Sequence, residues 1–168
     1  MTKRKRKKFN KKLYKKYTLL ALEYCRKTYT RYYDPKEYIL VQPFIIFVDD
    51  ISRYGEITDK RIYFDKKDFP KTKDNLVYFD IIKINLKNHF TDEDHPLVSL
   101  RETVLHEYGH FFLGDDLRKR RAGERSGNYF AFKESKNCSK WIKKNYNKYK
   151  VNRFGELVKR CKMLVKRN

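Results

Sequence analysis

The feature that most constrains this chain is an apolar segment, residues 96–113, that carries two histidines four positions apart. It begins at Pro96, and proline is favoured at the first position of a helix. Apolar residues then recur at intervals of three and four, which is typical of a buried helix, and Gly114 is a suitable residue to end it. Residues four apart lie on one face of a helix, so His106 and His110 are expected side by side.

The two histidines and the glutamate after the first form the pattern His-Glu-x-x-His, whose spacing suits a zinc site. Two imidazoles on one helical face can bind one Zn²⁺ at about 2.0–2.1 Å. Glu107 lies beside His106 and can take a proton from a water molecule held by the ion. The segment therefore predicts one catalytic zinc ion, bound by His106 and His110, with Glu107 as the general base. Gly109 weakens the helix by about 1 kcal/mol relative to alanine, so we expect another element to pack against its backbone.

A catalytic zinc ion needs a third protein ligand, and two carboxylates are candidates. Asp116 lies six residues after His110, where metzincins place their third ligand, although Leu113 stands where that family has glycine. Glu124 lies on a second predicted helix, at about residues 122–133. The residues themselves leave both candidates open.

The segment around Glu124 resembles the gluzincin metallopeptidases, in which a glutamate ligand is followed four residues later by aspartate or asparagine. Glu124, Gly127 and Asn128 fit this pattern, with Gly127 where alanine is usual. Within that group, the strand, the His-Glu-x-Gly-His helix and the run Glu-x-x-Gly-Asn-x-Phe-Ala at 124–131 most resemble the ImmA/IrrE-type metallopeptidases, over roughly residues 76–133. The resemblance implies a zincin-like fold, Glu124 as the third ligand and Asn128 as the partner that orients a ligand.

Hydrophobic periodicity along the chain predicts helices at residues 9–33, 96–113, 122–133, 139–149 and 152–165, and strands at residues 38–48, 61–64 and 76–86. Pro43 indicates an edge strand or a bulge. Residues 49–60 predict a turn region around Gly55, and His89 and His95 are expected in loops with ordinary polar roles. We therefore expect a basic flexible tail, residues 1–8, and one α+β domain, residues 9–168, with a small mixed sheet and a C-terminal helical cap.

The formal net charge is +21, and it is concentrated at the two ends of the chain. Residues 1–33 hold 13 basic residues and 1 acidic residue, and residues 117–168 hold 18 and 3, whereas residues 34–116 hold 11 and 17. Such ends could dock on a polyanion such as nucleic acid or an acidic membrane surface. The other explanation for the high lysine content is AT-rich codon usage, which favours Lys, Asn, Tyr, Ile and Phe together.

Targeting signals are few in this sequence. No apolar run approaches the roughly 18 residues of a membrane span, and the basic N-terminus is not followed by the apolar region of a secretory signal. Cys25, Cys138 and Cys161 are too few and too widely spaced for a disulfide framework. We therefore expect a cytoplasmic protein without a membrane span.

Two functions from different classes remain open. The first is a zinc metalloendopeptidase that hydrolyses peptide bonds in a protein substrate, which the resemblance extends to a regulator of a mobile element or virus. The strand at 81–86 is expected to offer an exposed edge to an extended substrate peptide. SprT-like proteases also carry the motif and act on DNA-bound proteins. They usually take a third histidine ligand downstream of the motif, however, and no histidine follows His110 in this sequence. The alternative is a non-enzymatic basic nucleic-acid-binding protein whose metal site is structural or degenerate.

Overall fold

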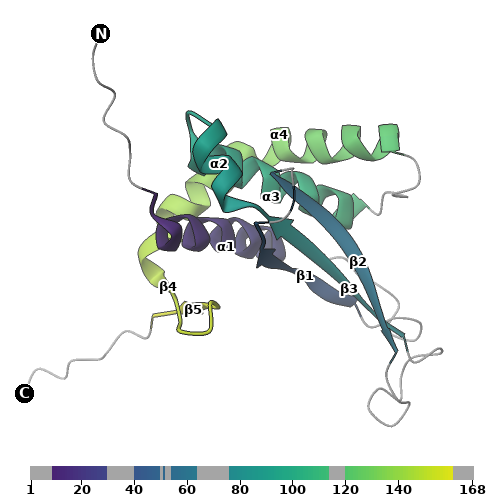
Figure 1. Cartoon of the computed structure of the whole chain (residues 1–168), viewed down its shortest axis with the longest axis horizontal. Coiled ribbons are helices and arrows are strands. Elements are labelled where there is room, and N and C mark those ends of the chain that lie inside the picture. The colour runs from purple at the N-terminus through teal and green to yellow at the C-terminus, as the bar shows by residue number, and fades with distance from the viewer. Residues whose placement is uncertain are drawn as a thin grey trace, which may run out of the picture.

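The computed structural model describes residues 9–29, 40–49, 51, 54–63, 76–113 and 120–160, and the predicted tail at 1–8 lies outside them. The elements are α1 (Lys11–Thr28), β1 (Leu40–Phe47), β2 (Gly55–Tyr63), β3 (Leu76–Ile84), α2 (Leu86–Asp92), α3 (Pro96–Leu113), α4 (Arg120–Asn145), the 3₁₀ turn Tyr146–Lys148, β4 (Tyr149–Val151) and β5 (Leu157–Lys159) (Figure 1). The predicted α+β class is confirmed. Within the described ranges, no helix has both the length and the apolar character needed to cross a membrane.

The main sheet has three strands in the order β1-β3-β2, with β1 parallel and β2 antiparallel to β3. It is therefore small and mixed, as predicted. Both indications from Pro43 are confirmed, because β1 is an edge strand and its register shifts between Val41 and Phe44. The Arg26 side chain of α1 donates to the Pro43 carbonyl at this irregularity. The expectation of an exposed edge at residues 81–86 is wrong, because β3 is paired on both sides.

Two expectations, for the segments that precede and follow β3 in the sequence, are also wrong. Gly55 begins a nine-residue strand instead of lying in a turn, because continuous pairing with β3 satisfies the backbone of this polar segment. Strand β3 ends at Ile84, because the Asn85 side chain accepts hydrogen bonds from the backbone of residues 87 and 88 and so caps α2. His89 consequently lies on a helix and is fully buried, not in a loop.

Helices α1 and α3 pack against the end of the sheet where β1 and β3 finish and β2 begins, and α4 packs on α3 and α1. The far ends of β2 and β3 extend away from the helices (Figure 1). The most buried apolar side chains are Leu20, Ala21, Leu22 and Cys25 of α1, Ile82 and Ile84 of β3, Leu100, Val104, Leu105 and Tyr108 of α3, and Cys138 and Ile142 of α4. Helix α3 therefore lies in the centre of the core, which fixes its position relative to both the sheet and α4.

Helix α4 is continuous over 26 residues, so the two helices predicted at 122–133 and 139–149 are one. The reason is that Glu134 and Cys138 continue the buried stripe across the expected break. The Glu134 carboxylate is 3% exposed and accepts a hydrogen bond from the Tyr24 hydroxyl at 2.5 Å. Glu134 thus belongs to the buried face of α4 although its side chain is charged.

The expectation of a C-terminal helix at 152–165 is wrong for the residues described. In its place β4 and β5 form a short antiparallel hairpin. The Asn152 side chain accepts hydrogen bonds from the backbone N–H of Phe154 and Glu156, and Gly155 adopts a φ of 85°. These local bonds favour a turn over a helix, and the remainder of the predicted helix, residues 161–168, lies outside the described residues.

Candidate metal centre

Helices α3 and α4 approach closely because two glycines face each other where they cross. A Cβ added to Gly109 would lie 3.2 Å from the Cα of Gly127 and 2.8 Å from the Cβ of Phe130. Both distances are shorter than an ordinary contact between carbon atoms. The expectation that another element packs against Gly109 is therefore confirmed, and that element is α4.

Three candidate ligands converge beside this crossing. His106 and His110 come from α3, and their Nε2 atoms are 2.9 Å apart. Glu124 comes from the first turns of α4, and its Oε2 is 3.4 Å from Nε2 of His106. All three residues offer a ligand atom within 4.8 Å of the others, so they form a group that could hold a metal ion. Of the two carboxylates considered, Glu124 lies at the histidines, whereas Asp116 lies outside the described residues.

Asn128 fixes the orientation of the first histidine. It lies one helical turn after Glu124, and its Oδ1 is 3.1 Å from Nδ1 of His106. Because an amide oxygen only accepts, Nδ1 carries the proton and donates, which leaves the Nε2 lone pair directed at His110 and Glu124. Sequence resemblance assigned this orienting role to Asn128, and the contact is of the kind that tunes metal ligands.

The electrostatics of the site favour a neutral imidazole at His106. Burial lowers the pKa of His106 below its ordinary value, and the neighbouring His110 adds to this effect, whereas Glu124 and Asn128 oppose it. A neutral imidazole is the form that coordinates a metal ion. The site thus directs nitrogen and carboxylate lone pairs at one point between two helices. Nε2 of His106 carries no proton that would compete with a metal ion.

The spacing of these donors is close to what zinc requires. Two ligand atoms about 2.0–2.1 Å from a tetrahedral ion are about 3.3 Å apart. The separations of 2.9 Å between the two Nε2 atoms and 3.4 Å between Nε2 of His106 and Oε2 of Glu124 lie on either side of this value. Gly127 also leaves room for the two imidazole rings, because an added Cβ there would lie 2.9 Å from Nδ1 of His106 and from Nε2 of His110. The residues present therefore fit a small cation with two nitrogen ligands and one oxygen ligand.

The centre opens into a cleft of about 1540 Å³ between α3, α4 and the start of β2. Glu107 lines this cleft with His106, Glu124 and Asn128, although its side chain is only 8% exposed. The start of β2 is held against α3, since a Cβ on Gly55 would lie 2.5 Å from Cγ2 of Thr103. The cleft is therefore bounded by closely packed elements, with a buried carboxylate beside the candidate ligands.

The other two histidines lie outside the cluster. His89 is buried and its Nδ1 lies 2.8 Å from Oγ of Ser99, while its ring packs on Tyr54 at 4.8 Å. His95 is exposed, lies in the bend before α3 as expected, and lines the far part of the cleft. Among the described tyrosines, Tyr54 lines the cleft, a position that sequence alone could not select.

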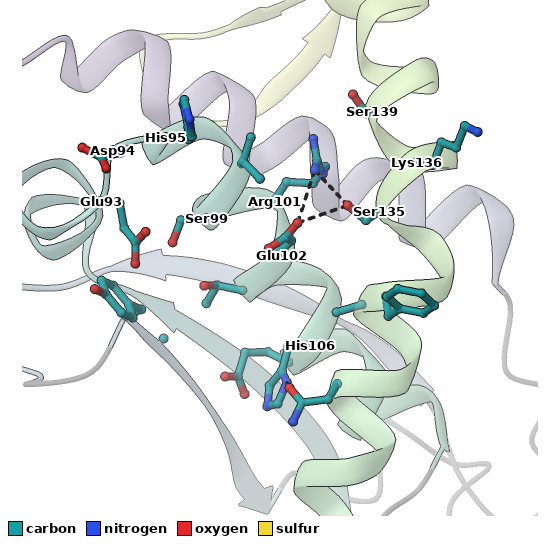
Figure 2. Close-up of a pocket in the computed structure, with 18 of the residues that line it drawn as sticks. Glu93, Asp94, His95, Ser99, Arg101, Glu102, His106, Ser135, Lys136 and Ser139 are labelled. Atoms are coloured by element: carbon teal, nitrogen blue, oxygen red, sulfur yellow. Dashed lines mark hydrogen bonds and ion pairs between the residues drawn. The ribbon is translucent and has the colours of Figure 1, made fainter.

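Sequence reasoning missed the upper half of the cleft, which Figure 2 shows. Arg101, Glu102 and Ser135 meet there by hydrogen bonds and an ion pair. Lysines of α4 line the same region, and Lys136 is among them. The only signal in the sequence was that Arg101 interrupts an otherwise apolar helical face.

Comparison with known proteins assigns no family to this chain. No family model matches it, no curated protein matches it, and no solved structure matches it. What the chain does must therefore be inferred from its own residues.

Proposed function

We propose that this chain is a zinc-dependent metallopeptidase with a zincin-like fold, in which His106, His110 and Glu124 hold one catalytic ion. The observation that carries the proposal is the convergence of the two Nε2 atoms and the Glu124 carboxylate at one point. Three protein ligands leave one tetrahedral position open, which is typical of catalytic zinc and not of structural zinc. Zinc, when bound, supplies Lewis-acid activation of water and of a carbonyl group.

Glu107 is the residue that we propose for proton transfer. It follows a proposed ligand directly in sequence, lines the cleft and is nearly buried. A carboxylate in this position can take a proton from the attacking water and pass it to the leaving amine. Asn128 holds His106 in the required tautomer. Gly109 and Gly127 allow the two helices to come close enough for the ligands to meet.

The substrate that we propose is a protein segment in an extended conformation. The cleft is open to solvent, is lined by residues of α3 and α4, and has a volume of about 1540 Å³, which is enough for several residues of a peptide. Since β3 is paired on both sides, the edge expected there is absent, and β2 is the edge strand at the cleft. The resemblance to ImmA/IrrE-type metallopeptidases suggests a regulator of a mobile element or virus as the natural substrate.

The mechanism is tested by replacing Glu107 with glutamine. This variant should keep zinc at the wild-type level and lose at least a thousandfold of its activity, which lies within the range of general-base and electrostatic contributions. Cleavage is followed by mass spectrometry on a peptide library digested by the zinc-loaded full chain. Cleavage by Glu107→Gln at the wild-type rate would show that another residue moves the proton.

The basic hairpin favours a second candidate function, nucleic-acid binding. Within the described residues, 148–160 contain Lys148, Lys150, Arg153, Lys159 and Arg160 but a single acidic residue, and Phe154 at the turn is 74% exposed. Exposed aromatic and basic side chains together suit single-stranded nucleic acid. If the chain bound DNA with a steep salt dependence and cleaved no peptide at all, this function would replace the first.

A further inference from the structure

A buried arginine lies in the cleft, away from the proposed metal ligands. Arg101 is 8% exposed, and its Nη2 donates a hydrogen bond to Oγ of Ser135 at 2.8 Å. Its Nε has no hydrogen-bond partner among the residues described. A buried guanidinium with an unmet donor is costly unless an acceptor reaches it. The arrangement therefore resembles a site prepared for an anion.

The wall beside Arg101 continues this positive charge. Lys136, Lys140 and Lys143 lie four and three residues apart on α4, a spacing that puts them on one face, and all three line the cleft. The wall at the turn before α3 is acidic, because Glu93 and Asp94 line it. Figure 2 shows Glu93 and Asp94 on one side, Lys136 on the other, and Arg101 with Ser135 between them.

We propose that Arg101, Ser135 and this lysine row form a carboxylate-binding subsite that selects an acidic segment of the peptide substrate. The proposal rests on the proposed function and names its substrate class. An extended peptide directs successive side chains to opposite sides, so it can present carboxylates to α4 and neutral or basic groups to the acidic wall. A nucleic acid carries phosphate along its whole length, and Glu93 and Asp94 would repel it from the same cleft.

The position of the acidic residue follows from helix geometry. Arg101 precedes His106 by five residues, which is about 7.5 Å along the helix axis at about 1.5 Å per residue. An extended peptide advances about 3.3 Å per residue. The carboxylate that reaches Arg101 therefore lies two or three residues from the bond that is cleaved. The lysine row, further along α4, receives any additional acidic residues.

Glu102 shows how the subsite accepts a carboxylate. Its Oε1 accepts a hydrogen bond from Oγ of Ser135 at 3.3 Å and lies 3.5 Å from Nη2 of Arg101. Both contacts are long, and the Glu102 side chain is 51% exposed, so it can turn to solvent. A substrate carboxylate would replace it at the arginine. Glu102→Gln removes the competing charge and should therefore strengthen the binding of acidic peptides.

The test measures peptide binding by fluorescence anisotropy with full-length Glu107→Gln, so that cleavage does not interfere. Three labelled alanine-rich decapeptides serve as probes: one with glutamates at four alternate positions and an amidated C-terminus, one with glutamines at the same positions and an amidated C-terminus, and one with these glutamines and a free C-terminus. The glutamate peptide should bind about tenfold more tightly than the amidated glutamine peptide. If the free C-terminus restores tight binding, the subsite takes a terminal carboxylate. Equal binding of all three would overturn the proposal.

Matched substitutions separate the subsite from general charge. Lys140→Gln with Lys143→Gln should weaken the glutamate peptide at least fivefold. Lys133→Gln with Lys144→Gln removes the same charge from exposed positions of α4 that do not line the cleft, and should change affinity less than twofold. Arg101→Met should lose the preference for glutamate, and Arg101→Lys should keep part of it, with thermal melts to show that both fold. Equal losses in the two lysine pairs would contradict the proposal.

Two further results would also overturn it. Loss of peptide binding in EDTA would mean that the carboxylate binds the metal, not Arg101. The surface would be assigned to nucleic acid if a single-stranded oligothymidylate bound more tightly than the glutamate peptide and lost this binding in the Lys140→Gln, Lys143→Gln variant. Failure of the proposed function is read separately, from zinc content and from cleavage by the wild-type chain, neither of which depends on the preference for glutamate.

Discussion

Replacing Gly109 by alanine should push α3 and α4 apart at the metal centre. The added Cβ would lie 2.8 Å from the Cβ of Phe130. Carbon atoms need about 3.5 Å, so the helices must separate by about 0.7 Å. Metal sites tolerate about 0.2 Å in ligand distances, so Glu124 and Asn128 would no longer reach the α3 histidines correctly. Overpacking costs about 1–3 kcal/mol, and better helix propensity returns about 1 kcal/mol, so stability should fall by about 0–2 kcal/mol.

The assay compares zinc affinity, by competition with a chromophoric chelator, with stability from urea unfolding. Gly109→Ala should lose at least tenfold in zinc affinity while remaining folded. Gly155→Ala is the matched control, because it places alanine at a φ of 85° on the hairpin with nothing near its Cβ. That change should lower the free energy of unfolding by about 1–2 kcal/mol without altering zinc affinity. Wild-type zinc affinity in Gly109→Ala would refute the role of the helix crossing.

Three other perturbations follow from the described contacts. Asn128→Ala should weaken zinc binding about 10–100-fold by freeing the His106 ring, and unchanged affinity would remove Asn128 from the site. Tyr24→Phe removes the hydrogen bond to buried Glu134 and should lower the free energy of unfolding by about 1–3 kcal/mol in urea titrations; a loss near zero would contradict this. Burial raises the pKa of the Cys138 thiol from 9.0 to about 12, so the unfolded chain loses this proton first. The thiol's contribution is therefore full below about pH 9 and falls by about 1.4 kcal/mol per pH unit up to about pH 12. Cys138→Ala should reduce the pH dependence of the free energy of unfolding by that amount. A slope identical to that of the wild type would contradict this prediction.

The features that the sequence predicted correctly depend on local signals. Helix α3 has the predicted bounds because Pro96 starts it and its apolar residues repeat with helical spacing. The irregularity of β1 follows from the missing N–H of Pro43. The close approach at Gly109 was expected because an unexplained glycine weakens a helix. In each case the residue itself restricts the backbone.

The features that it did not predict depend on contacts between distant segments. Helix α4 continues past residue 133 because Glu134 meets Tyr24, which lies 110 residues earlier. The hairpin at the C-terminal side is selected by bonds from Asn152 that compete with a helix of similar apolar spacing. Arg101 interrupts an apolar helical face in the sequence, but its burial depends on α4, whose Ser135 accepts its hydrogen bond. The meeting of Glu124 with the histidines likewise depends on the crossing of α3 and α4.

Zinc content tests the central claim most directly. The full chain, reconstituted with zinc and dialysed, is analysed for metal beside His110→Ala and Glu124→Ala. The wild type should hold about one zinc ion per chain, and both variants should lose it, since three ligands are needed for a stable site. No zinc in the wild type, or zinc fully retained in Glu124→Ala, would contradict the assignment of His106, His110 and Glu124 as a metal centre.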